Sequence, residues 1–98
     1  MTIGKIQNGS ALTLELDGRL DTNTAPLLDK ELNTSLDGIK DLTFDFAKLE
    51  YVSSAGLREL IIAYKIMHEQ GHMRVINANE IVKEVFEVTG VSNIISVN

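Results

Sequence analysis

The stretch YVSSAGLREL, Tyr51 to Leu60, joins an apolar pair of residues to a run with helical periodicity. Two adjacent serines, Ser53 and Ser54, stand at the junction. The start of a helix needs only one capping side chain, because one oxygen at the N-cap position accepts a hydrogen bond from an unpaired amide of the first turn. If Ser53 is this cap, Ser54 occupies the first helical position with its hydroxyl directed outward. The second hydroxyl then has no structural task.

The segment before this junction has the pattern of a strand. Leu42, Phe44 and Phe46 alternate with less apolar residues, which is typical of a half-buried strand, and we expect this strand to end near Asp45. Beyond the serines, apolar residues recur at helical spacing until Gly71, a typical helix terminator. The stretch therefore predicts a strand, a serine-containing turn and an amphipathic helix.

The same two periodicities divide the rest of the chain. Before the stretch already described, we expect a short strand over 3–6, a hairpin turn at Asn8-Gly9, a strand through Leu12, Leu14 and Leu16, and a helix that Thr24 caps and Gly38 ends. After it, we expect a short strand over 72–77, a helix from Asn79 to Gly90 and a short last strand over 94–97. Strands that alternate with helices predict an α/β fold, a mixed sheet of four to five strands with helices packed on it. Whether the helices cover one face or both is open.

Functional groups in such folds collect where strands end and helices begin. We expect three such corners, at Asp17–Thr24, Ala47–Gly56 and Asn77–Glu80, and the second contains the two serines.

Composition limits the class of protein. The chain has 98 residues, 44% of them hydrophobic and 23% charged, which predicts a single domain spanning residues 1–98. A net charge of −5 with dispersed basic residues argues against nucleic acid as a partner. No apolar run approaches the roughly 20 residues of a membrane span, so we expect no membrane partner. The absence of cysteine agrees with a cytoplasmic setting.

Catalytic and metal-binding chemistry find little support in the sequence. The two histidines, His68 and His72, have no further ligands at metal-binding spacing, so we expect no metal and no cofactor. A serine hydrolase would have a glycine two residues before its nucleophile, and this chain has a valine there. A phospho-aspartate receiver needs clustered acidic groups that hold magnesium, and Asp45 has only Asp17 and Asp21 as companions. We therefore expect a protein that is not an enzyme.

The segments LDGRLDTNTA and DFAKLEYVSSAGLREL together resemble the anti-sigma factor antagonist family, whose STAS domain is shared with the cytoplasmic tails of sulfate transporters. The positions that match the family's pattern are Gly18, Leu20, Asp21, Asp45, Leu49, Tyr51, Val52, Ser54, Gly56 and Leu57. Two positions depart from it, because Ser53 stands where members often have aspartate and Ala55 where many have serine or threonine. Longer members also carry one more helix after the third.

The resemblance implies a regulatory binding protein. Its phosphoacceptor would be Ser54, with Ser53 as the alternative, and its partner an anti-sigma factor with serine kinase activity. The unphosphorylated protein would bind this partner and release a sigma factor, and a serine phosphatase is left open as a further partner. The alternative is a constitutive STAS-type interaction or scaffold module without phosphorylation. The residues expected to contact the partner are Asp21, Thr22, Asn23, Ser53, Ala55, Gly56, Leu57 and Arg58.

Overall fold

The computed structural model describes all 98 residues. Its strands are β1 (Thr2–Asn8), β2 (Ala11–Leu20), β3 (Asp41–Val52) and β4 (His72–Ile76). Its helices are α1 (Ala25–Ser35), α2 (Ser54–Gln70), α3 (Glu80–Val88) and the short 3₁₀-helix η1 (Val91–Asn93). The predicted α/β order of strands and α-helices is confirmed, and η1 is an addition that the sequence pattern did not predict.

One mixed sheet contains all four strands, in the order β1-β2-β3-β4. β1 and β2 form an antiparallel hairpin, while β2, β3 and β4 run parallel. The hairpin loop is Gly9-Ser10, one residue later than expected, because Asn8 still pairs with Ala11. Gly9 adopts a φ of +62°, a conformation that glycine tolerates and most residues do not. Parallel pairing brings the C-terminal ends of β2 and β3 together at one end of the sheet.

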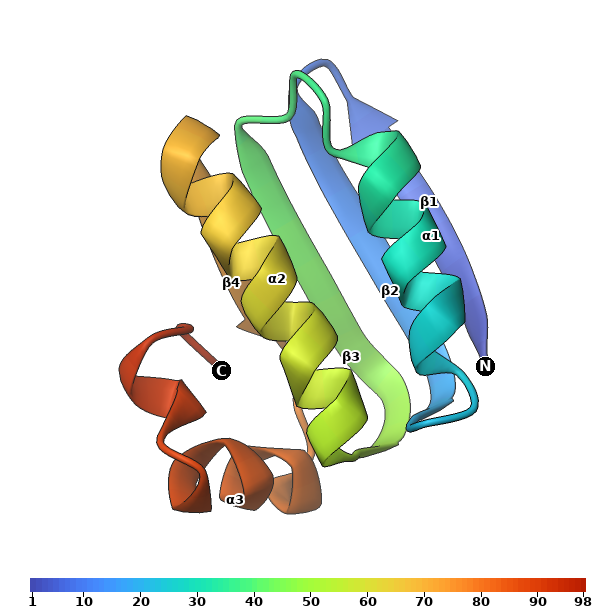
Figure 1. The fold of residues 1–98 in the computed structure, drawn as a ribbon, viewed down its shortest axis with the longest axis vertical. Helices are drawn as coiled ribbons and strands as arrows, with labels where there is room; N and C mark the ends of the chain where they lie inside the picture. Colours follow the sequence, from blue (N-terminus) through green and yellow to red (C-terminus); the bar gives the residue numbers. More distant parts are fainter.

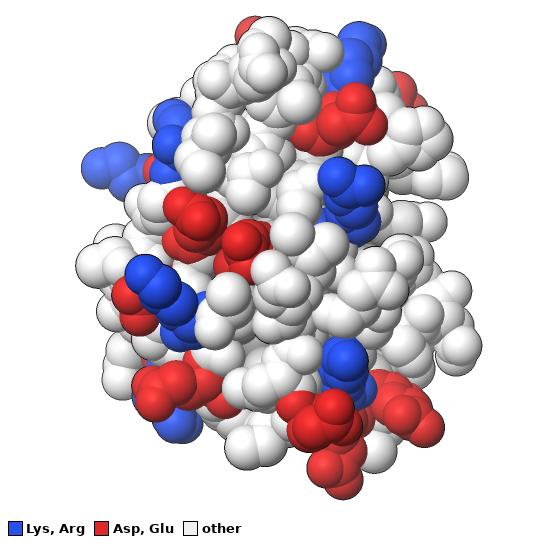
Figure 2. Space-filling view, turned by 180° about the vertical axis from the view of Figure 1, so that it is seen from behind, with Lys and Arg blue, Asp and Glu red and all other residues white.

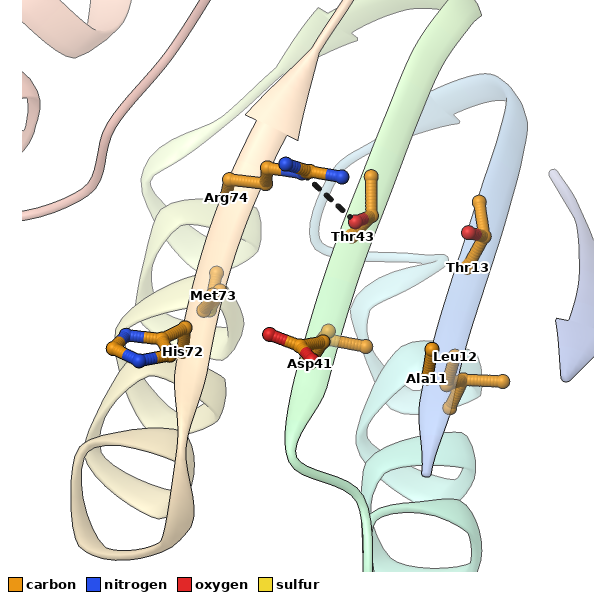
Figure 3. Close-up of a pocket in the computed structure, with 9 residues that line it drawn as sticks. Ala11, Leu12, Thr13, Asp41, Thr43, His72, Met73 and Arg74 are labelled. Atoms are coloured by element: carbon orange, nitrogen blue, oxygen red, sulfur yellow. Dashed lines mark hydrogen bonds between the residues drawn. The ribbon is translucent and has the colours of Figure 1, made fainter. Parts of the chain in front are cut away.

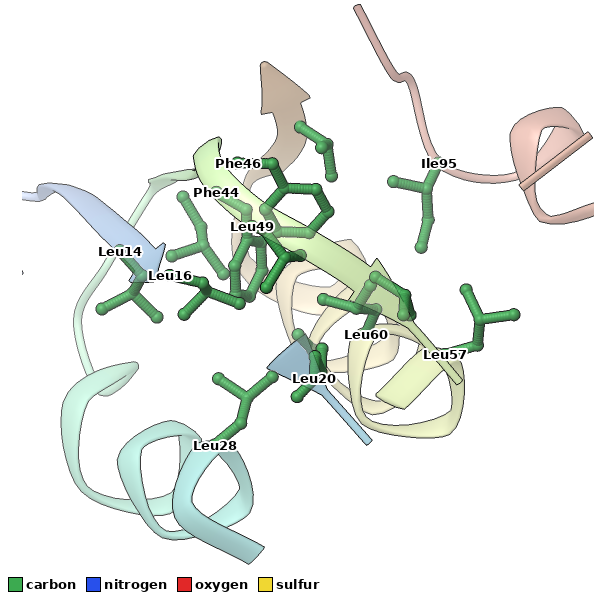
Figure 4. Packing of buried hydrophobic residues seen from close by; sticks show 14 of the residues in the cluster. Leu14, Leu16, Leu20, Leu28, Phe44, Phe46, Leu49, Leu57, Leu60 and Ile95 are labelled. Atoms are coloured by element: carbon green, nitrogen blue, oxygen red, sulfur yellow. The ribbon is translucent and has the colours of Figure 1, made fainter. Parts of the chain in front are cut away.

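The helices α1 and α2 lie side by side on one face of the sheet, which answers the question that the sequence left open (Figure 1). Both begin at the end of the sheet where β2 and β3 finish, and α3 lies near the same end. Alternate residues of β2 and β3, among them Leu14, Leu16, Phe44 and Phe46, point between sheet and helices into a core of 23 buried residues (Figure 4). This burial is why alternation was visible in the sequence.

The strand β3 is longer and less regular than predicted. Its pairing with β2 shifts register between Glu15 and Asp17, and again between Gly18 and Arg19. Each shift places one extra residue in β3, which makes it a β-bulge. After Phe46 the buried residues of β3 therefore follow at intervals of three, and they are Leu49 and Val52.

The expectation that Asp45 ends a strand is thus wrong. Asp45 lies within β3 at the first bulge, where its Oδ1 accepts hydrogen bonds from the backbone amide of Ala47 at 3.0 Å and from Nδ2 of Asn77 at 3.0 Å. The first bond satisfies the backbone amide of Ala47, and the second links β3 to Asn77, which directly follows β4. Because β2 and β3 continue to Leu20 and Val52, the first two corners begin later than predicted.

The last residues pack back against β4. The expected final strand is only a single parallel bridge between Val75 and Val97. Around it, the amide of Val75 donates to the carbonyl of Ser96 at 3.0 Å, and the amide of Asn98 donates to the carbonyl of Val75 at 3.0 Å. Residues 96–98 therefore cover part of the outer edge of β4.

Candidate functional site

Two loops meet where β2 and β3 end, and we call residues 21–23 and 53–58 together the acceptor corner. The last residues of the two strands, Leu20 and Val52, are paired in the sheet. Directly after them, the backbone amide of Ser53 donates to the carbonyl of Leu20 at 2.9 Å. The parallel strands therefore bring together two loops that are far apart in the sequence.

Gly56 fixes the distance between these loops. A Cβ atom at this buried position would lie 2.6 Å from Cγ of Leu20 and 2.8 Å from its carbonyl oxygen. Without a side chain, Gly56 lets another part of the molecule approach its backbone closely. In the structure it is Leu20, the residue immediately before the other loop, that makes this approach.

The two serines have the separate positions that the sequence predicted. Ser53 is the N-cap of α2, with an extended backbone, and its Oγ accepts a hydrogen bond from the amide of Gly56 at 3.3 Å. Ser54 is the first residue of α2 and is exposed, and its hydroxyl makes no hydrogen bond within the chain. The free hydroxyl stands beside the positive end of the helix dipole, which favours an added negative charge.

In the first loop, the polar side chains bond to the backbone of the loop itself. Oδ1 of Asp21 accepts from the amides of Asn23 at 3.0 Å and Thr24 at 3.2 Å. The hydroxyl of Thr24 accepts from the amide of Asp21 at 2.9 Å and donates to the carbonyl of Arg19 at 2.7 Å. Thr24 occupies the N-cap position of α1 but makes no capping bond to that helix, so its predicted capping role is wrong.

The residues expected to contact a partner fall into three groups. Exposed at the acceptor corner are Thr22, Asn23, Ser54 and Arg58. Partly buried are Asp21, Ser53 and Ala55. Gly56 and Leu57 are buried, and Leu57 belongs to the core with 5% of its surface exposed. The first group forms the surface that a partner can touch, and the last shapes the corner from beneath.

Two residues beside the corner were not singled out for this position from the sequence. The guanidinium of Arg19, near the end of β2, lies 4.7 Å from the ring centre of Tyr51 on β3, a cation–π contact. Nε of Arg19 also lies 3.8 Å from Oδ2 of Asp21. Arg19 and Tyr51 are paired only because of the second bulge, which no local sequence pattern indicates.

The third predicted corner is joined to the same bulge by one side chain. Asn79, near which the third helix was predicted to begin, is the N-cap of α3 and accepts a hydrogen bond from the amide of Val82 at 2.8 Å. Its Nδ2 donates to the carbonyls of Leu49 at 3.1 Å and Glu50 at 3.3 Å. Asn79 therefore holds the start of α3 against the last part of β3.

A pair of carboxyl groups lies between α1 and α2. Oε1 of Glu59 is buried without a hydrogen-bond partner. Burial raises the pKa of Glu59 above its ordinary value of 4.5, and the neighbouring carboxyl of Asp29 raises it further, while Arg58 opposes the shift. The cause is that a second negative charge is unfavourable where water is partly excluded.

The largest hollow lies away from the acceptor corner, on the sheet face that α1 and α2 leave open (Figure 3). It measures about 420 Å³ and is lined by the first residues of three strands: Ala11, Leu12, Thr13, Asp41, Leu42, Thr43, His72, Met73 and Arg74. Nε of Arg74 donates to the hydroxyl of Thr43 at 3.1 Å. Acidic and basic side chains are mixed across this face, and acidic ones gather toward α3 (Figure 2).

The three acidic residues considered for a receiver-type site do not form one cluster. Asp17 and Asp45 line a smaller hollow of about 180 Å³ on the open face, where Lys48 accompanies them. Asp21 lies in the acceptor corner instead, and does not line this hollow.

None of the helices is long and apolar enough to span a bilayer.

Comparison with known proteins gives consistent matches. The sequence model of the STAS domain matches residues 2–98. BtrV of Bordetella bronchiseptica, named as a candidate anti-sigma factor antagonist, is 34% identical over 84 residues, which cover 84% of this chain and 72% of BtrV.

Two solved structures share the fold. An anti-sigma factor antagonist from Mycobacterium paratuberculosis has a TM-score of 0.87 at 20% identity, over 98% of this chain and 83% of that one. The Bacillus cell fate determinant SpoIIAA, in its phosphorylated form, has a TM-score of 0.76 at 14% identity, over 99% of this chain and 91% of that one.

Proposed function

The chain belongs to the STAS domain family and, within it, to the anti-sigma factor antagonists, and we propose that it is a binding switch controlled by phosphorylation of Ser54. Proteins of this family are regulatory binding proteins rather than enzymes. In the proposed mechanism the unmodified acceptor corner binds an anti-sigma factor that is also a serine kinase, and a sigma factor is released. Phosphorylation of Ser54 by this kinase ends the binding.

The observation that carries this proposal is that only one of the two serine hydroxyls is used in the fold. Ser53 caps α2, so that its hydroxyl is engaged, while the hydroxyl of Ser54 is exposed and unbonded at the same turn. A kinase can reach Ser54 without breaking a bond of the fold. Ser53, the alternative acceptor, would lose its capping bond on modification.

Electrostatics explains why modification would release the partner. A phosphate on the exposed Ser54 takes the net charge of the chain from −5 to about −7. A charge of this size repels partner carboxylates and is costly to bury against apolar groups. Each tenfold loss of affinity corresponds to about 1.4 kcal/mol, which repulsion at close range readily supplies.

The test is incubation with the serine-kinase anti-sigma factor, ATP and magnesium, followed by intact-mass measurement and peptide mapping. We expect one phosphate, located on Ser54, which is absent in Ser54→Ala and present in Ser53→Ala. In a binding assay, Ser54→Asp should bind the anti-sigma factor more weakly than the unmodified wild type, and Ser54→Ala should bind constitutively. Phosphate on Ser53, or wild-type affinity of Ser54→Asp, would contradict the assignment.

The same experiment separates the switch from a constitutive interaction or scaffold module. Such a module would bind its partner with unchanged affinity after incubation with kinase and ATP, and would incorporate no phosphate. The free hydroxyl at the first position of α2 favours the switch, because a scaffold gives it no role.

A further inference from the structure

We propose that Arg58 binds the phosphate of phosphorylated Ser54, so that modification also withdraws the one uncommitted guanidinium of the acceptor corner. This inference rests on the proposed function, because it takes Ser54 as the phosphoacceptor. It adds a second element to the switch: phosphorylation introduces negative charge and at the same time occupies a cation that the unmodified protein presents.

The helix geometry places the two residues together. Ser54 is the first residue of α2 and Arg58 follows four positions later, and both are exposed. Residues four apart lie on the same face of an α-helix, with Cβ atoms about 5–6 Å from each other. An arginine side chain spans this gap easily, and its planar group matches phosphate oxygens with two parallel hydrogen bonds.

Arg58 is free to make this contact. It takes part in none of the side-chain hydrogen bonds of the structure, and the ion pairs present are Lys5–Glu31 and Arg19–Asp21. The second guanidinium near the corner, that of Arg19, is already held by Asp21 and the ring of Tyr51. Of these two cations, Arg58 is the one that can turn to a new anion without losing an existing partner.

The neighbouring carboxyl groups do not compete strongly for Arg58. Glu59 on α2 and Asp29 on α1 are the acidic groups that face this part of the helix. The charge of Arg58 opposes the rise in the pKa of Glu59, but neither carboxyl group lies within ion-pair distance of the guanidinium. A phosphate dianion at Ser54 offers three strong acceptor oxygens on the exposed side, where Arg58 already lies.

The test uses the full chain with phosphoserine installed at position 54 by genetic encoding, so that no kinase is needed. The ³¹P NMR signal is followed through a pH titration in the wild type and in Arg58→Gln. Because a nearby cation favours the dianion, we expect the second ionisation of the phosphate to occur about 0.3 pH unit lower in the wild type. The Nε resonance of Arg58 should shift on phosphorylation.

Three variants complete the design. Lys65→Gln removes the same charge from an exposed position farther along α2, and should leave the phosphate midpoint within about 0.1 pH unit of the wild type. Arg58→Lys should recover part of the shift. Arg19→Gln should resemble Lys65→Gln.

Equal midpoints in Arg58→Gln and Lys65→Gln would overturn the inference, as would a shift seen with Arg19→Gln instead. Circular dichroism confirms that each variant is folded. Since the phosphate is installed without a kinase, failure here leaves the kinase assay of Ser54 unaffected, and failure of that assay leaves this result unaffected.

Discussion

The two loops of the acceptor corner begin with similar polar residues but leave different groups free. In the loop after β2, the side chains of Asp21 and Thr24 are bonded to the backbone of the loop. In the turn after β3, one hydroxyl caps α2 and the hydroxyl of Ser54 bonds to nothing. The difference teaches that a polar side chain becomes available for chemistry when the backbone around it is already satisfied.

The contact that joins the loops should give the largest effect. Gly56→Ala would place a methyl group 2.6 Å from Cγ of Leu20 and 2.8 Å from its carbonyl, so the first loop must move. Overpacking of this kind costs about 1–3 kcal/mol, measurable by urea unfolding. Gly4→Ala is the control, since its nearest neighbour is the flexible carboxylate of Glu15 at 3.2 Å. Equal losses of unfolding free energy in Gly56→Ala and Gly4→Ala would show that the close approach of Gly56 to Leu20 is not the cause of the destabilisation.

A smaller effect is expected from the carboxylate of the first loop. Asp21→Ala removes the acceptor of two backbone amides and should lower the free energy of unfolding by about 1–2 kcal/mol, as the loss of a helix cap does. Asp21→Asn keeps an oxygen in the same place and should restore most of this stability. If Asp21→Ala instead unfolds like the wild type but binds the anti-sigma factor weakly, Asp21 belongs to the docking surface. Both loops would then present a polar side chain to the partner.

The serines test the second loop. Ser53→Ala should lower the free energy of unfolding by about 0.5–1 kcal/mol, toward the small end for a cap because its hydrogen bond is long at 3.3 Å. Ser54→Ala should stay within about 0.5 kcal/mol of the wild type, since no bond is lost. Ser53→Asp, which restores a capping oxygen, serves as the matched control. If Ser54→Ala unfolds at a lower temperature than Ser53→Ala, the assignment of cap and free hydroxyl would be reversed.

The smallest effect is expected between the helices that follow the loops. The pKa of Glu59 is raised in the folded protein, so the folded state holds this proton more tightly than the unfolded chain does. Its contribution to stability is therefore full below pH 4.5 and is lost as the pH rises through the folded-state pKa. Relative to the wild type, Glu59→Gln should gain thermal stability as the pH rises, and Glu69→Gln, exposed on the same helix, should not. If the difference in thermal stability between Glu59→Gln and the wild type stays constant across the titration, the pKa of Glu59 is not raised by folding.

Local patterns in the sequence predicted much of this architecture. The alternation of Leu42, Phe44 and Phe46 marks a strand because each of these side chains enters the core. It could not show where the strand ends, because the two bulges change the interval between buried residues and place Leu49 and Val52 three positions apart. A period of two does not detect a strand with that spacing.

The same distinction between local and long-range features applies to the candidate site. The roles of Ser53 and Ser54 in the helix start were predictable, since capping involves residues within one turn. The contact of Arg19 with Tyr51 and the bonds from Asn79 to β3 were not, because both depend on the register between distant segments. The choice of Ser54 as phosphoacceptor stays a prediction.

Residues 96–98 have a further consequence for the protein in concentrated solution. An outer strand with unpaired amides and carbonyls is a template on which another chain can add a strand, the first step of aggregation. On β4, Ser96 and Asn98 already occupy the amide and the carbonyl of Val75. A second molecule would have to displace them before it could pair with β4 at this point. The same few residues that complete the fold therefore also act against fibril-like growth from that edge.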